Sequence, residues 1–255
     1  MHMRCRIIFE DQELMIVYKP AGLATQSASV GQPDVVSELK KYLCGAYVGV
    51  VHRLDQPVEG LLVFAKTPKT AAHLTKQLSG GTLNKRYLAA VCGKPSGISA
   101  TLVDYLRKDG NLARVVTGRE KEYPDAKLAK LTYELRAERA CLVLTGADAC
   151  AGNAGTEEAV SLLEVTIETG RFHQIRAQLA HAGFPILGDK KYGNGVSDGL
   201  ALKCGITSVA LCAHQLTLSH PVTKKNLSWE IKPDWMKIFE PEQTTGADGI
   251  EKVNG

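Results

Sequence analysis

The chain has 255 residues, of which 44% are hydrophobic and 23% are charged, and its formal net charge is +4. This composition is typical of one or two globular domains and excludes a disordered, collagen-like or coiled-coil chain. Its apolar runs, such as Leu61–Ala65, are far shorter than the roughly 20 residues of a membrane-spanning helix. The first apolar run ends at Glu10 and is too short for a signal-peptide core, so a cytoplasmic location is expected.

The N-terminal half of the chain carries signals for strands and short helices. Ile7–Phe9 and Leu14–Tyr18 are apolar runs on either side of a polar turn, which predicts a hairpin. Thr67-Pro68 has the cap residue and the first-turn proline of a helix, which Gly80-Gly81 ends. Three further elements are expected: a short amphipathic helix at Val35–Leu43, a buried strand at Leu61–Ala65 and an alternating strand at Lys85–Val91.

The C-terminal half is richer in strand signals. Leu163, Val165 and Ile167 alternate with polar residues, which predicts a half-buried strand. The other expected elements are strands and turns across 101–135, an exposed loop at 145–158, a helix at Phe172–Ala182, a strand at Val209–Leu218 and a flexible tail at 241–255. Together they predict a single domain over residues 1–240, of α/β or α+β class.

Cysteine and histidine spacing gives no sign of a metal centre. The seven cysteines are dispersed without CxxC spacing and are expected to be reduced thiols. His173 and His181 are eight positions apart, too far for one turn of a helix to present both to a metal. The tail 241–255 is acidic, which leaves a mildly basic body that is compatible with nucleic acid binding but does not establish it.

Two segments do not follow the pattern of core and surface. The first, residues 51–60, places His52, Arg53 and Asp55 within four positions just before an apolar strand. It could be a solvated turn or a set of reactive groups. The second, residues 169–176, lies where a strand is expected to pass into a helix, and the start of a helix favours anions. Its polar stripe could be a plain helix surface or a surface that holds phosphate or carboxylate groups.

The order of several short motifs is more specific than any one of them. The segment HRLD before a glycine and an apolar strand, then KRYLA, TGRFHQIR and GFPILGDKKYG, resembles the RluA family of RNA pseudouridine synthases. The opening EDQELMIVYKPAGL resembles the first motif of that family, and the similarity extends over about residues 7–230. Val58-Glu59 stands where the family usually has Thr-Ser. Because the first motif begins within ten residues of Met1, no preceding S4-type RNA-binding domain is expected.

The resemblance implies an isomerase that converts uridine to pseudouridine in ribosomal or transfer RNA. It implies the α+β fold of that family: a long, mainly antiparallel mixed sheet, flanked by helices and crossed by a central cleft. It also implies a monomer that needs no cofactor, metal or membrane. In this comparison Asp55 is the nucleophile, attacking C1′ of the ribose or C6 of the base. Arg176 is its charge partner, and Tyr87 is the tyrosine that stacks on the base and can take the C5 proton.

The same resemblance assigns contacts to RNA. Arg53 matches the arginine that fills the place of a flipped-out uridine. His52 is expected to be structural or to contact RNA. Lys19, Arg171, His173 and Gln174 complete the predicted set of RNA-binding residues. On the residues alone, Tyr87 could equally be a core aromatic and Arg53 part of a surface salt bridge.

Two other functions remain open from the sequence. A retaining glycosidase or nucleosidase could use Asp55, but it needs a second carboxyl group about 5 Å away, for which Glu59 is the nearest candidate. A non-catalytic RNA-binding module would rely on exposed aromatic side chains. Aromatic residues make up only 6% of this chain, which disfavours such a module.

Overall fold

The computed structural model describes residues 3–27, 31–143 and 156–240. The predicted tail 241–255 and most of the predicted loop 145–158 lie outside the described residues. Residues 156–158 belong to a strand instead, so the expected loop is shorter at that end. No helix in the described part of the chain is long and apolar enough to cross a membrane.

Eleven strands form one sheet, and four α-helices and two short 3-10 helices complete the described fold. The strands are β1 (Arg6–Glu10), β2 (Leu14–Lys19), β3 (Gly49–Val50), β4 (Glu59–Ala65), β5 (Asn84–Cys92), β6 (Ser99–Asp109), β7 (Leu112–Val115), β8 (Lys127–Val143), β9 (Thr156–Ile167), β10 (Leu211–Ser219) and β11 (Asn226–Glu230). The helices are α1 (Val35–Tyr42), α2 (Pro68–Ser79), η1 (Glu120–Glu122), α4 (Gln174–His181), α5 (Gly195–Lys203) and η2 (Asp234–Phe239).

Local sequence explains where these helices begin. Thr67 caps α2 by accepting a hydrogen bond from the Thr70 amide, and Pro68 occupies its first turn, as predicted. Asn194 and Ser197 form a reciprocal capping box at the start of α5. The helix predicted at Phe172–Ala182 extends over Gln174–His181, and its start is later than predicted because His173 adopts a left-handed backbone conformation just before Gln174.

The sheet consists of two antiparallel halves that meet at one parallel pair. The strand order is β1-β2-β4-β10-β5-β9-β8-β6-β7, with β3 beside β4 and β11 beside β10. Among the pairings of named strands in the described chain, only that of β4 with β10 is parallel. Gly60 lies at this junction with a φ of +136°, and a Cβ there would come 2.5 Å from the Ala213 amide nitrogen. Only glycine permits this close approach.

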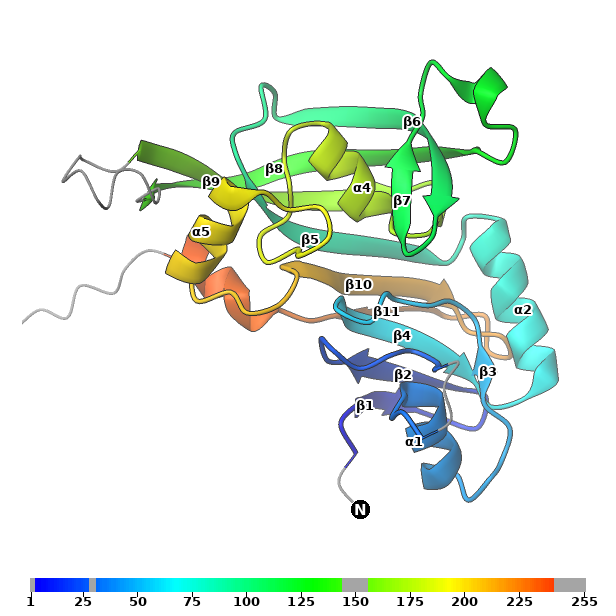
Figure 1. The fold of residues 1–255 in the computed structure, drawn as a ribbon. Helices are drawn as coiled ribbons and strands as arrows, with labels where there is room; N and C mark the ends of the chain where they lie inside the picture. The colour runs from blue at the N-terminus through cyan, green and yellow to red at the C-terminus, as the bar shows by residue number, and fades with distance from the viewer. Residues whose placement is uncertain (1–2, 28–30, 144–155, 241–255) are drawn as a thin grey trace, which may run out of the picture.

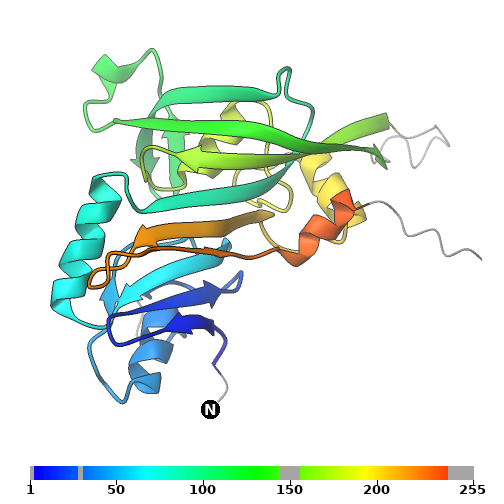
Figure 2. The same ribbon diagram turned by 180° about the vertical axis from the view of Figure 1, so that it is seen from behind.

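Helices α1, α4 and α5 lie on the same face of the sheet (Figure 1). The larger hydrophobic core lies beneath them and includes Leu62 and Phe64 of β4. Leu61 and Val63 point to the other face, where a smaller core includes Leu74 of α2. Seen from behind, strands β6, β8 and β9 are uncovered on that second face (Figure 2). This architecture confirms the predicted α+β class and the mainly antiparallel mixed sheet flanked by helices.

Glu59 has a structural role in this sheet. Its side chain is 9% exposed, and its two oxygens accept hydrogen bonds from the Tyr18 hydroxyl at 2.5 Å and from Trp235 Nε1 at 2.8 Å. Tyr18 lies on β2 and Trp235 on η2, so one carboxylate ties the C-terminal 3-10 helix to the N-terminal half of the sheet. The unusual Val58-Glu59 pair therefore has a structural explanation at its second position.

We expect Glu59→Ala to lower the free energy of unfolding by about 2–3 kcal/mol, because two half-buried donors lose their acceptor. Glu59→Gln keeps a carbonyl oxygen for Trp235 and an amide for the Tyr18 oxygen, so it should cost less than about 1 kcal/mol. Urea unfolding of both variants beside the parent chain measures the difference. Equal losses in the two variants would show that the hydrogen bonds are not what stabilises this region.

Candidate active site

A cavity of about 700 Å³ opens between the two halves of the sheet. Its walls come from residues 52–58, the start of β5, the end of β9 and the first turn of α4. Eight of the nine predicted site residues line it: His52, Arg53, Asp55, Tyr87, Arg171, His173, Gln174 and Arg176. Segments far apart in the chain thus meet in the predicted cleft.

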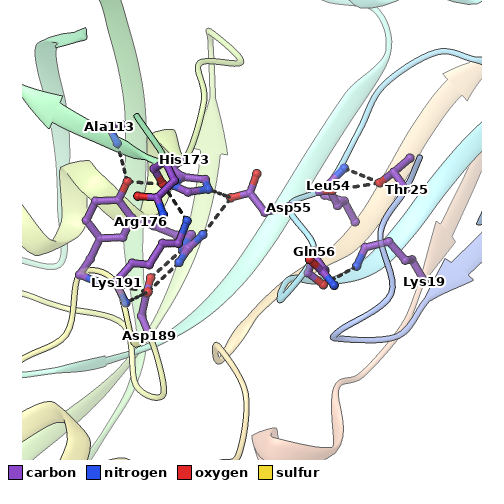
Figure 3. Close-up of polar contacts among 12 residues, drawn as sticks. Lys19, Thr25, Leu54, Asp55, Gln56, Ala113, His173, Arg176, Asp189 and Lys191 are labelled. Carbon is purple, nitrogen blue, oxygen red and sulfur yellow. Dashed lines mark hydrogen bonds and ion pairs between the residues drawn. The ribbon is translucent and has the colours of Figure 1, made fainter. Parts of the chain in front are cut away.

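The backbone around Asp55 is held on both sides. The Thr25 hydroxyl donates to the Leu54 carbonyl at 2.9 Å and accepts from the Leu54 amide at 3.1 Å. On the other side, the Lys19 ammonium donates to the Gln56 carbonyl at 3.1 Å (Figure 3). The Asp55 side chain is 28% exposed and points from this clamped segment toward α4. A reactive carboxylate on an irregular segment therefore has a fixed position.

Arg176 is the charge partner of Asp55, and its position is set by a second carboxylate. Its guanidinium is 2% exposed and forms a bidentate ion pair with Asp189, with both N–O distances at 2.7 Å. Its Nη1 lies 3.3 Å from Asp55 Oδ2. Burial acts to lower the pKa of Arg176, but hydrogen bonds and charge from Asp189 and Asp55 raise it on balance. The predicted ion pair between Asp55 and Arg176 is present.

Tyr87 lies on β5 in the wall of the same cavity and is 5% exposed. Burial, and then the negative charge of Asp55, raise the pKa of its hydroxyl well above the ordinary value. The phenol is therefore protonated at neutral pH.

His173 lies directly beside Asp55. Its Nε2 is 3.7 Å from Asp55 Oδ2, and its Nδ1 is 2.8 Å from the Tyr192 hydroxyl. Burial lowers its pKa to about 4, although the charge of Asp55 acts in the opposite direction. The ring stacks on Phe172, with centroids 3.8 Å apart and planes at 20°. His173 is thus an uncharged imidazole in a fixed orientation at neutral pH.

Three basic side chains lie at the rim and wall of the cavity. Arg53 is exposed and donates to Gln26 Oε1 at 2.8 Å; among the described residues, no carboxylate pairs with it. Arg171 is exposed, and its Nε donates to the Leu128 carbonyl at 2.9 Å. Burial lowers the pKa of Lys85 to about 8. The cavity is therefore bordered by positive charge.

Three of the residues predicted to bind RNA make hydrogen bonds within the protein. Lys19 is fully buried outside the residues that line the cavity, and its ammonium donates to three backbone carbonyls, so its side chain is occupied in the structure without RNA. Gln174 lines the cavity but is 4% exposed, and its amide hydrogen-bonds Thr169, the Arg171 amide and the Lys130 carbonyl. His52 is buried and accepts from the Val63 amide at 3.3 Å, which fits the structural alternative.

Sequence reasoning missed two residues that organise the site. Asp189 orients Arg176, and it also accepts hydrogen bonds from the amides of Lys191 and Tyr192, which fixes their loop. Tyr192 in turn contacts His173. Both lie in the segment GDKKYG, which stood out as a motif. The available signal in the sequence was an acidic residue followed by a tyrosine between two glycines.

The site holds one carboxylate beside a cation, a protonated phenol and an uncharged imidazole. Within the described ranges, no group of three or more His, Cys, Asp and Glu side chains could hold a metal ion. The arrangement suits nucleophilic attack by a carboxylate that lies beside a guanidinium.

Comparison with known proteins agrees with this chemistry. Residues 13–181 match the family model described as RNA pseudouridylate synthase. A ribosomal large subunit pseudouridine synthase D of Zymomonas mobilis is 30% identical over 92% of this chain and 71% of its own length. A tRNA pseudouridine synthase C of Vibrio cholerae is 29% identical over 87% of this chain and 88% of its own length.

A solved structure has the same fold. The human RNA pseudouridylate synthase domain containing 1 aligns over 92% of this chain and 86% of its own, with a TM-score of 0.69 and 15% identity. At that identity the similarity concerns the fold alone. The chain spans 61–88% of the length of the first curated relatives that it matches, and about two thirds in several of them.

The buried imidazoles make stability depend on pH. Burial lowers the pKa of His52, His173 and His214 below the ordinary value of 6.5, so the folded chain binds fewer protons than the unfolded chain. The contribution of these uncharged imidazoles to the free energy of unfolding is complete above about pH 6.5 and is lost as the pH falls toward 4. We expect the free energy of unfolding to fall between pH 7 and pH 5, by up to about 1.4 kcal/mol per pH unit for each group.

Urea unfolding at pH 7, 6 and 5 tests this expectation. His173→Gln should reduce the slope, whereas His181→Gln, at an exposed position, serves as the matched control and should leave it unchanged. A stability that stays level or rises toward pH 5 would contradict the assignment of neutral imidazoles.

Proposed function

This chain belongs to the RNA pseudouridylate synthase family, and from that premise we propose that it is an isomerase that converts uridine in RNA to pseudouridine. The observation that carries the proposal is the pairing of Asp55 with the buried Arg176 in the wall of a cavity that also contains Tyr87. The enzyme detaches uracil from C1′, rotates it and joins it again through C5. Because no electrons are gained or lost overall, the reaction needs no redox cofactor.

Asp55 is the proposed nucleophile. If it attacks C1′, a lone pair of its carboxylate forms the new bond while the C1′–N1 bond breaks and leaves its electron pair on uracil. If it attacks C6, the C5–C6 π pair moves toward the O4 carbonyl. Both routes need an ionised carboxylate in the resting site, and the guanidinium of Arg176 is its counter-ion, with Nη1 3.3 Å from Asp55 Oδ2.

Tyr87 is proposed to stack on the base and to take part in the removal of the C5 proton. The raised pKa of its hydroxyl means that it begins the reaction protonated, so its first role is to pack against the base and to donate a hydrogen bond. Removal of the C5 proton by Tyr87 would require deprotonation after the base has rotated.

Arg53 is proposed to support base flipping. A stacked or paired uridine must leave its helix to reach a cavity of this kind, at a cost of a few kcal/mol. Arg53 is long and exposed, and among the described residues its side chain is bound only by the neutral amide of Gln26, so it can move into the vacated position. Arg171 and Lys85 supply further positive charge for the phosphate backbone.

Ribosomal and transfer RNA are the proposed substrate classes, since relatives named for each match most of this chain. We propose a single catalytic unit over residues 1–240, acting as a monomer in the cytoplasm. The continuous sheet from β1 to β11 supports one unit.

A glycosidase reaction is less well supported by the geometry. Glu59 is engaged by Tyr18 and Trp235, and Asp189 uses both oxygens on Arg176. Glu168 lines the cavity, but it is an exposed side chain paired with Lys130 at 2.8 Å. None of the three is a free acid beside Asp55, as a retaining glycosidase would require.

We expect Asp55→Asn to abolish isomerisation while RNA affinity stays within about threefold, because an amide keeps the shape but cannot form the covalent bond. Arg176 keeps its bidentate partner Asp189, so the fold should survive. Tritium release from RNA labelled at C5 of uridine measures the reaction, since a glycosidase would free base or sugar and a simple binder would release nothing. Activity within tenfold of the parent chain would mean that another residue is the nucleophile.

Arg53→Ala should reduce the rate on a folded RNA at least tenfold more than on an unstructured oligonucleotide with the same target uridine. Unstacking of the target uridine costs free energy only in the folded RNA. Single-turnover rates on the two RNAs give the comparison, and Arg171→Ala is the matched control for loss of one rim charge. An equal loss on both RNAs would make Arg53 a plain electrostatic contact.

A further inference from the structure

Both close side-chain contacts of the Asp55 carboxylate involve the same oxygen. Arg176 Nη1 is 3.3 Å and His173 Nε2 is 3.7 Å from Oδ2. In the described part of the chain, no side chain makes a hydrogen bond to Oδ1, whereas Arg176 donates one to Oδ2. The two oxygens of the proposed nucleophile are therefore chemically different before any substrate arrives.

A chain of hydrogen bonds sets the proton position on His173. The Ala113 amide donates to the Tyr192 oxygen at 2.7 Å, and the Tyr192 hydroxyl lies 2.8 Å from His173 Nδ1. A phenol whose oxygen already accepts can give its own hydrogen to Nδ1. The ring hydrogen is then on Nε2, which faces Asp55. The other tautomer would turn the Nε2 lone pair toward a carboxylate, which is repulsive.

The ring cannot easily turn away from this position. Phe172 stacks on one face, and Tyr192 packs edge-on with its centroid 5.6 Å away. The backbone of His173 has a φ of +52°, which places the side chain at the start of α4 above the cavity. A non-glycine residue in this conformation costs free energy, and such strain is common where a side chain must be aimed.

From these observations we propose that His173 is a positioning residue that, with Arg176, holds Oδ2 and leaves Oδ1 as the oxygen that attacks, and that Tyr192 sets the tautomer it needs. This inference rests on the proposed function. The 3.7 Å separation is longer than a hydrogen bond, as catalytic contacts often are before the substrate binds, and the proposed role requires it to shorten in the reacting complex. An uncharged donor orients the carboxylate without placing a second positive charge beside it, so nucleophilicity is preserved.

Substitution of His173 by each of the two amide residues distinguishes the contribution of Nε2 from that of Nδ1. In His173→Gln the side-chain amide reaches the place of Nε2 and can still donate to Asp55. In His173→Asn it reaches only the place of Nδ1, which keeps Tyr192 but loses Asp55. We expect kcat within about tenfold of the parent for His173→Gln and a loss of about 100-fold for His173→Asn, with KM for RNA nearly unchanged in both.

If His173 mattered only for its left-handed backbone conformation, the two variants would show the opposite order of activity. Asparagine tolerates a left-handed backbone better than glutamine does, so His173→Asn would then be the more active and more stable variant. Thermal unfolding of both variants shows whether each is folded. An asparagine variant as active as the glutamine variant, or both within threefold of the parent, would overturn the inference.

Tyr192→Phe tests the tautomer step. Without the hydroxyl, kcat should fall about tenfold in the parent chain, but not further in the His173→Gln background, where no tautomer exists. Equal losses in the two backgrounds would show that Tyr192 acts independently of His173. Absence of tritium release from the parent chain would instead overturn the proposed function, so the two failures are distinguishable.

Discussion

Arg176 carries a positive charge in a place that is 2% exposed, and a charge so buried is tolerable only when it is paired. Asp189 takes one edge of the guanidinium in a bidentate pair, which fixes its plane and leaves Nη1 directed at Asp55. Asp55, Asp189 and the ring of Tyr192 all contact this planar group. The 189–193 loop is ordered by the same Asp189, and Tyr192 of that loop reaches His173. A lysine could not make the two parallel hydrogen bonds that keep the group in its plane.

The parallel junction is the second constraint, because it brings the two antiparallel halves of the sheet to the distance that this ion pair needs. Asp55 comes from the half that contains β2 and β4, and Arg176 from the helix that follows β9. Gly60 allows β4 and β10 to approach, and Glu59 beside it ties down η2. At the second position of the Val58-Glu59 pair, Glu59 thus takes part in the scaffold behind Asp55 through its hydrogen bonds to Tyr18 and Trp235.

Much of this arrangement could be predicted from the sequence, for physical reasons that also explain what was missed. Alternation and helix capping depend on residues that are near neighbours in the sequence, so the hairpin, α1, α2 and the strands could be located. The order of the motifs then predicted that Asp55 and Arg176 share one site. The partner of a buried charge depends on the tertiary fold. Asp189 therefore could not be assigned to Arg176, nor could Lys19 be recognised as a buried clamp. The left-handed backbone at His173 was also not predicted, because this conformation is uncommon for any residue other than glycine, even for histidine, in which it occurs more often than in most.

The separation of the paired residues along the chain has a consequence for synthesis. Asp55 and Arg176 are 121 positions apart, and Asp189 is a further 13 beyond. A ribosome making this protein exposes the carboxylate long before its counter-ion has emerged, and a chain interrupted before α4 lacks both the guanidinium and the part of the cavity wall that α4 supplies. Strand β10, which joins the two halves of the sheet and contributes Leu211 to the cavity wall, is synthesised later still. The pocket around the carboxylate is therefore complete only when both halves of the sheet are present.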